Sequence, residues 1–129
     1  MKTVILEKID QNSIRMVWQK QPRLVDIRAA FKEIEDHLNE TNTPLYIIVI
    51  LPPNIRFPVG QTVWEALGCY RHEQSQGWLV VGGNSLAKLI ESILVRMTKR
   101  ENVLWFESES EALAHLASIN TAYNTSSTL

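Results

Sequence analysis

The sequence has little of several features that define common classes of protein. Cys69 is its only cysteine, so the chain can form neither an intramolecular disulfide nor a cysteine-rich zinc site. Thirteen basic side chains nearly balance 14 acidic ones, and the net charge of −1 gives no general attraction to phosphate backbones or anionic lipid. These absences argue against a disulfide-stapled secreted domain and against a basic nucleic-acid-binding protein. A reducing compartment, the cytoplasm, is the expected location.

Long hydrophobic runs are also missing. The longest uncharged apolar stretch, residues 45–51, falls far short of the roughly 20 residues that a membrane-spanning helix needs. Glu7 and Lys8 interrupt the apolar N-terminal run before the core of a signal peptide can form. We therefore expect neither a transmembrane segment nor a secretory signal. A chain of 129 residues, 45% hydrophobic, is typical of one domain that builds its own core.

The first half of the chain alternates between strand and helix patterns. Val, Ile and Trp are frequent in residues 4–9 and 14–19, and the polar residues between them predict a β-hairpin. A helix with an apolar stripe follows, with Asp26 as its expected N-cap and its end near Thr41. Residues 45–51 are continuously apolar, which predicts a strand buried on both faces.

The second half continues this alternation through residue 119. It predicts helices over about 60–74 and 85–99, strands over 78–81 and 103–106, and a last helix that begins with the capping-box pair Ser108 and Glu111. In the third helix the apolar stripe is expected to face inward; it consists of Leu86, Leu89, Ile90, Ile93, Leu94 and Met97. The order β-β-α-β-α-β-α-β-α predicts an α/β layered domain whose mixed sheet is largely parallel in its second half. The polar residues 120–129 are expected to form a flexible tail.

This order and spacing of elements resembles the STAS fold over roughly residues 3–118. That fold is shared by bacterial anti-sigma-factor antagonists, their SpoIIAA-like relatives and the cytoplasmic domains of some anion transporters. In the phosphorylatable antagonists, the loop after the central strand ends in a sequence like Asp-Ser-Ser-Gly, whose serine a partner kinase phosphorylates. Here Pro58-Val59-Gly60-Gln61 stands at that place. Gly60 replaces the serine, and Thr62 is the nearest hydroxyl.

Ligands and partners of open α/β sheets gather at the carboxyl ends of the parallel strands. Three segments are expected there: residues 52–62, 82–85 and 107–110. Within the second segment, Asn84 and Ser85 follow two glycines at a helix start, an arrangement that suits either an anion site or a plain capped turn.

The loop that follows the central strand carries apolar and aromatic residues. Trp64 is expected to combine with Ile55 and Phe57 in an apolar rim beside Arg56, and such a rim suits a partner protein or a lipophilic ligand. The alternative is that these residues fasten the loop to the domain.

Catalytic and metal-binding patterns are sparse. Cys69 and His72 are three residues apart on one predicted helix, which makes a thiol-imidazole pair conceivable, although no third member is near in sequence. The histidines show no metal-ligand spacing, and the acidic residues lie mainly on solvent-facing helix positions. We therefore expect no cofactor and no metal.

We expect a non-enzymatic domain that works by binding, and we weigh three functions. The first is a non-enzymatic regulatory module that binds a protein partner through Ile55, Arg56, Phe57, Gly60, Thr62 and Trp64. The second is a domain that binds a small lipophilic or anionic ligand at the strand ends, where Asn84 and Ser85 also lie. The third is an enzyme that uses Cys69 and His72. A homodimer is compatible with all three.

Overall fold

The computed structural model describes residues 2–127 and contains five strands and four helices in the predicted order. In chain order the elements are β1 (Val4–Asp10), β2 (Ser13–Trp18), α1 (Leu24–Glu40), β3 (Leu45–Leu51), α2 (Val59–Arg71), β4 (Ser75–Gly82), α3 (Ser85–Thr98), β5 (Val103–Phe106) and α4 (Glu109–Ser127). The expectation of an α/β domain with a hairpin followed by alternating helices and strands is therefore confirmed.

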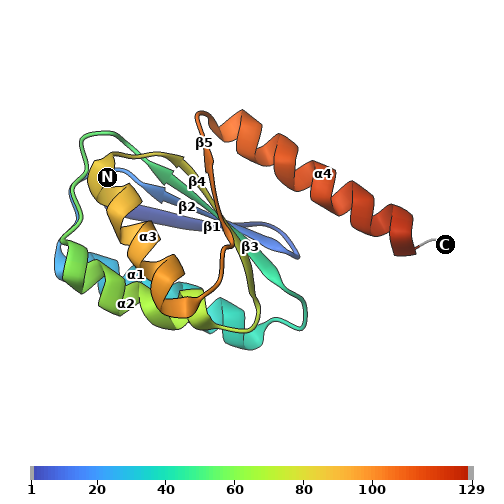
Figure 1. Ribbon diagram of the computed structural model, residues 1–129, viewed down its shortest axis with the longest axis horizontal. Coiled ribbons are helices and arrows are strands. Elements are labelled where there is room, and N and C mark those ends of the chain that lie inside the picture. The colour runs from blue at the N-terminus through green and yellow to red at the C-terminus, as the bar shows by residue number, and fades with distance from the viewer. Residues whose placement is uncertain (1, 128–129) are drawn as a thin grey trace.

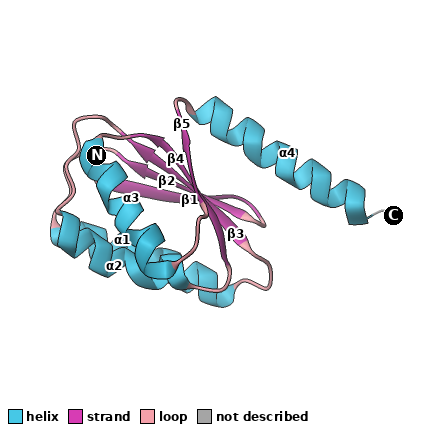
Figure 2. Ribbon diagram, viewed as in Figure 1, coloured by secondary structure: helices cyan, strands magenta, loops and turns pink. Residues whose placement is uncertain are grey.

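The strands form one mixed sheet in which spatial order follows chain order, β1-β2-β3-β4-β5 (Figure 2). β1 runs antiparallel to β2, and all other neighbouring pairs are parallel. Val49 of β3 pairs with Met16 on one side and Val80 on the other. Because parallel neighbours need a crossover connection, a helix lies between each pair of consecutive parallel strands.

The helices are divided unequally between the two faces of the sheet. α1, α2 and α3 lie together on one face, and α4 lies apart from them (Figure 1). Ile47 of β3 belongs to the core beneath the first three helices, whereas its neighbour Ile48 packs with Ala112 and Leu116 of α4. Since successive side chains of a strand point to opposite faces, this alternation explains why β3 is apolar throughout.

Two predicted helix boundaries differ from the observed ones. Arg23 is the N-cap of α1, and Asp26 stands three residues further on, where its carboxylate accepts a hydrogen bond from the Arg23 backbone N–H at 2.9 Å. α2 ends at Arg71 instead of about residue 74, because β4 already begins at Ser75. An acidic side chain interacts favourably with the positive end of the helix dipole both as the N-cap and as the third helical residue. The sequence therefore does not show which of these two positions Asp26 occupies.

The inward face of α3 is rotated relative to the predicted stripe. Leu89 and Met97 are 47% and 51% exposed, whereas Glu91 is 9% exposed and faces the core with Ile90 and Leu94. Apolar residues cover more than half of this helix, so their periodicity does not fix which side turns inward.

α4 is fastened to the sheet near its start. Glu109 forms a two-pronged ion pair with Arg15 of β2, and Arg15 also bonds Glu7 of β1 at 3.1 Å. The backbone of the expected tail is helical as far as Ser127, and the later turns of α4 extend beyond the sheet in Figure 1. Residues 128–129 lie outside the described part of the chain. Within residues 2–127 no helix is long and apolar enough to cross a bilayer.

Candidate functional site

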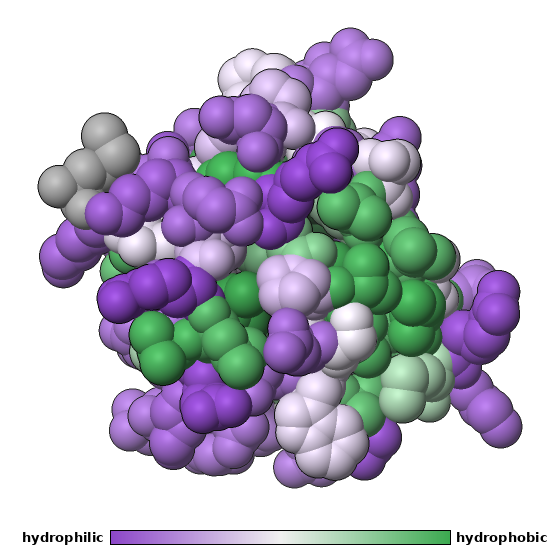
Figure 3. All heavy atoms as spheres, turned by 90° about the vertical axis from the view of Figure 1, so that its left-hand side faces the viewer, coloured by the Kyte–Doolittle hydropathy of each residue, from purple (hydrophilic) through white to green (hydrophobic). Residues whose placement is uncertain are grey.

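The carboxyl ends of β3 and β4 carry the two loops in which most of the predicted site residues lie. Figure 3 looks onto this end of the molecule and shows apolar surface interrupted by polar side chains. Asn84 joins the two loops, because its side-chain amide donates hydrogen bonds to the carbonyls of Pro53 at 3.1 Å and Ile55 at 2.8 Å. These bonds confirm that residues 52–62 and 82–85 meet, whereas the side chains of the third expected segment, residues 107–110, bond to one another, to Glu111 and to Arg15 of β2.

The loop of residues 52–58 is fastened on its other side as well. The Arg56 backbone N–H donates to Gln21 Oε1 at 2.9 Å, and Gln21 Nε2 donates back to the Arg56 carbonyl. Phe57 packs edge-on against Trp18 with their ring centres 5.0 Å apart. A loop held from two sides by hydrogen bonds and an aromatic contact presents a fixed surface.

Ile55 and Phe57 are core residues. Their side chains are 3% and 7% exposed, so they cannot form the expected apolar rim. Their burial corresponds to the alternative in which these residues fasten the loop to the domain. Because an aromatic ring gains most by leaving water completely, Phe57 turns toward Trp18 and away from solvent.

Trp64 is the member of the expected rim that does face solvent, with 75% of its side chain exposed. It lies in the second turn of α2, whose N-cap is Pro58. Gly60, four residues before it on the same helix, is exposed, as is Arg56 in the preceding loop, whereas Thr62 is buried at 5% exposure. The start of α2 therefore has an outward side, formed by Gly60 and Trp64, and an inward side that carries Thr62.

The turn of residues 82–85 uses its polar groups internally. Gly82 and Gly83 have φ angles of 77° and 97°, and a Cβ on Gly82 would lie 2.5 Å from the Leu51 carbonyl oxygen. Asn84 is the N-cap of α3, and its Oδ1 accepts from the Ala87 backbone N–H at 3.1 Å. Ser85 is exposed at the first helical position. The turn thus has the geometry of a capped strand-to-helix connection.

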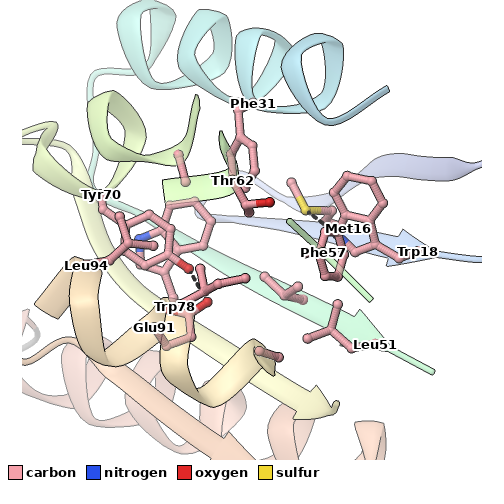
Figure 4. Close-up of a pocket in the computed structure, with 14 residues that line it drawn as sticks. Met16, Trp18, Phe31, Leu51, Phe57, Thr62, Tyr70, Trp78, Glu91 and Leu94 are labelled. Carbon is pink, nitrogen blue, oxygen red and sulfur yellow. Dashed lines mark hydrogen bonds between the residues drawn. The ribbon is translucent and has the colours of Figure 1, made fainter. Parts of the chain in front are cut away.

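Behind the loop of residues 52–58 lies a cavity of about 40 Å³, shown in Figure 4. It is bounded by the sheet, by α2 and by α3. Five of its 14 lining residues are aromatic: Trp18, Phe31, Phe57, Tyr70 and Trp78. Only Thr62, Tyr70 and Glu91 bring polar side-chain groups other than an indole N–H to its wall. The cavity is too small for a lipid chain.

Tyr70 and Glu91 form a buried polar pair at the cavity wall. The Tyr70 hydroxyl donates to Glu91 Oε1 at 2.5 Å, and the Tyr70 ring stacks on Trp78 with ring centres 4.0 Å apart. Burial raises the pKa of Glu91 to about 7, although the hydrogen bond from Tyr70 opposes that rise. Burial also raises the pKa of Tyr70 well above its usual value.

Two polar atoms at this wall have no hydrogen-bond partner among the described residues: Thr62 Oγ1 and Glu91 Oε2. Glu91 also borders a shallow surface groove of about 400 Å³ between α3 and β5, which Lys88, Arg96 and Trp105 line. The Lys88 ammonium lies 5.7 Å from the centre of the Trp105 ring. Glu91 therefore stands between the cavity and the outer surface.

Sequence reasoning missed Tyr70 and Glu91 as a polar pair. One signal was present for Glu91, because it stands four residues after Ala87 and three before Leu94, on what proves to be the buried side of α3. Tyr70 is buried at 3% exposure, as expected for an aromatic residue on the inward face of its helix. The two residues are 21 positions apart and lie on different helices, so no local sequence pattern indicates their contact.

Cys69 and His72 do not form a catalytic pair in this arrangement. The Cys69 thiol donates to the Phe31 carbonyl at 3.1 Å, and burial raises its pKa to about 12. His72 contacts Asn39 Oδ1 at 2.8 Å through Nε2 and accepts from the Gln74 backbone N–H through Nδ1. Since the thiolate is the nucleophile, these contacts argue against cysteine catalysis. No group of three or more potential metal ligands occurs among the described side chains.

Comparison with known proteins finds no relative of this chain. No family model, no curated protein and no solved structure matches the chain.

Proposed function

We propose that the protein is a non-enzymatic regulatory module that binds a partner protein through an outward patch at the start of α2. We call this patch, formed by Arg56, Gly60 and Trp64, the Trp64 surface. It retains the exposed part of the contact surface expected from the sequence. The buried residues Ile55 and Phe57 fasten the loop that carries Arg56 to the core.

One observation carries the proposal: the indole of Trp64 stands between two glycines on its own helix. Gly60 and Gly68 are four residues before and after it, positions that share one face of an α-helix. A Cβ on Gly60 would meet no atom within 4 Å, whereas a Cβ on Gly68 would lie 3.2 Å from Glu35 Oε2, so the open space lies on the Gly60 side of the indole. No side chain at either position covers the indole, and a partner can approach it closely.

Arg56 adds charge to the Trp64 surface. Its side chain is exposed and forms no ion pair with another described residue, while its backbone is fixed by Gln21. Tryptophan and arginine are the residues most often found at the energetic centres of protein interfaces. A fitting partner offers an apolar pocket for the indole and an acidic rim for the guanidinium.

The likeness to anti-sigma-factor antagonists supports a regulatory role by analogy. Gly60 stands where those proteins carry their phosphorylated serine, and Thr62 is buried against the cavity. Modification of Thr62 requires the start of α2 to open. The proposed module therefore binds without a phosphorylation switch at this point.

A photo-crosslinking amino acid placed at position 64 in the native host tests the proposal. Position 97 is the matched control, because Met97 is also an exposed apolar residue on a helix, 51% exposed and on α3. We expect one protein to be captured from position 64 and not from position 97. Capture of the same proteins from both positions, or of none from position 64, contradicts the Trp64 surface.

A further inference from the structure

The cavity between α2, α3 and the sheet is independent of the Trp64 surface, and its polar atoms call for an occupant. Thr62 and Glu91 are 5% and 9% exposed, and each has one buried oxygen without a hydrogen-bond partner among the described residues, at the wall of an otherwise apolar space. Nearly all buried polar atoms in native proteins have a hydrogen-bond partner. In Figure 4 both side chains point into the space that the aromatic residues surround.

The size of the cavity limits that occupant. One buried water molecule needs roughly 10–15 Å³ of cavity volume. The volume of about 40 Å³ therefore accommodates roughly three waters or one molecule of about three heavy atoms. A lipid, a nucleotide or a sugar is excluded by size.

The chemistry of the wall selects among small molecules. The free oxygen of Glu91 attracts a cation and repels an anion, and the Thr62 hydroxyl can accept a second hydrogen bond. Aromatic rings from α1, β2, β4 and the loop of residues 52–58, among them Trp18, Trp78 and Phe57, surround the remainder of the space. A carboxylate combined with several aromatic rings is the arrangement that recognises alkylated ammonium groups.

We propose that this cavity is a binding site for a small alkylammonium ion, held by Glu91 Oε2 and Thr62 Oγ1 and enclosed by the aromatic residues. The ion donates hydrogen bonds to both oxygens, and its alkyl group occupies the apolar part of the space. Tyr70 holds the other oxygen of Glu91, so the carboxylate keeps a fixed orientation. Because Glu91 also borders the groove beside α3, that groove offers a route of entry.

Binding should depend on pH through Glu91. The pKa of this carboxyl is about 7, so it becomes an anion as the pH rises through neutrality. The titratable groups around it are Tyr70 of α2, which contacts it, and Lys88 of α3, which borders the same groove; the constantly charged Arg96 of α3 borders it too. The facing strands β4 and β5 contribute only Trp78, Val103 and Trp105.

NMR titration of the full chain with ethylammonium chloride tests the proposal, with the indole N–H signals as reporters. Trp18 and Trp78 line the cavity, whereas Trp64 is exposed and serves as an internal control. We expect saturable shifts at the two buried indoles only. Ethanol, which has the same number of heavy atoms, should bind at least about tenfold more weakly, and acetate should not bind. The affinity for ethylammonium should increase from about pH 6 to about pH 8.

Two variants locate the ion within the cavity. Glu91→Gln keeps an oxygen for Tyr70 and removes the charge, and it should weaken ethylammonium binding by about tenfold or more while leaving ethanol binding nearly unchanged. Thr62→Val should weaken binding of both. Met97→Ala, on the exposed side of α3, should change neither.

Three results overturn the proposal. The first is the absence of a saturable shift at Trp18 and Trp78. The second is equal affinity for ethylammonium and ethanol in the wild-type chain, a comparison that needs no variant to fold. The third is a crystal structure grown in ethylammonium that shows only water between Thr62 and Glu91.

Discussion

At the scale of single residues, Phe57 and Trp64 are separated by seven positions and play opposite parts. Phe57 is 7% exposed and packs on Trp18, whereas Trp64 is 75% exposed. Both are aromatic residues near a proline-rich loop, and the sequence alone does not tell them apart. The contact of Phe57 with Trp18 joins positions 39 residues apart, and that contact decides its burial.

Replacement of each of these two residues by alanine should change the free energy of unfolding by very different amounts. Phe57→Ala removes a buried ring and should lower the free energy of unfolding by about 3–5 kcal/mol. Trp64→Ala should change it by no more than about 0.5 kcal/mol, since the indole contacts solvent. Urea unfolding of the two variants measures both values. Similar losses in the two variants would contradict the assignment of Trp64 to the surface.

Glu91 should make the stability of the protein depend on pH. Its pKa is about 7 in the folded chain, against an ordinary value of 4.5. The folded state therefore holds a proton that the unfolded state has released between these pH values, and stability falls as the pH rises from about 4.5 to 7. The free energy of unfolding falls by on the order of 3 kcal/mol over this range. Below about pH 4.5 the titration of Glu91 causes no such loss.

Unfolding of the wild type and of Glu91→Gln at pH 5 and pH 8 measures this effect. Other titrating groups contribute equally to both proteins, so the difference between them isolates Glu91. We expect the wild type to lose more stability than the variant between the two pH values. An identical change in both proteins would show that Glu91 titrates at its ordinary pKa.

At the scale of elements, the order of strands and helices was predictable because most of them have a strong apolar pattern and α4 begins with a capping-box pair. β3 and β5 begin and end where the sequence places them. The face of α3 was not predictable, because Leu89 and Met97 fit the apolar period as well as Ala87 and Leu94 do. The cavity was equally out of reach, since its polar pair comes from two different helices.

The connection from β4 to α3 should be sensitive to the side chain of Asn84, which holds the loop of residues 52–58 through its amide and caps α3 through its oxygen. Asn84→Asp keeps the capping oxygen and loses both bonds to the loop. Asn84→Ala loses all three bonds and should lower the free energy of unfolding by roughly 1 kcal/mol more than Asn84→Asp does. Hydrogen exchange of residues 52–58 should accelerate in both variants, and unchanged exchange in either would contradict this role of the amide.

Replacement of Gly82 or Gly60 by alanine should change the stability of the protein in opposite directions. Gly82 has a φ of 77° and no space for a Cβ beside the Leu51 carbonyl, so Gly82→Ala should destabilise the protein by more than about 1 kcal/mol. Gly60 lies in α2 with open space around it, and Gly60→Ala should stabilise the protein by about 0.4–1 kcal/mol. Thermal unfolding of the pair provides the comparison. A loss of stability in Gly60→Ala would mean that the start of α2 is strained.

At the scale of the whole molecule, the sheet, three helices and one loop enclose a small and largely apolar cavity, while the first turns of α2 present an indole to solvent. The inward side of α2 carries Thr62 and Tyr70 at the cavity, and the outward side carries Gly60 and Trp64. One helix therefore connects the proposed alkylammonium site with the proposed protein-binding surface. The two proposals rest on opposite sides of it, so each can fail without the other.

The affinity of the crosslinked partner for Trp64→Ala is the measurement that tests the central claim most directly. We expect this variant to bind at least about 30-fold more weakly than the wild type, as is typical of a tryptophan at the centre of an interface. Met97→Ala should bind as the wild type does. Wild-type affinity in Trp64→Ala, with the fold intact, would contradict the account.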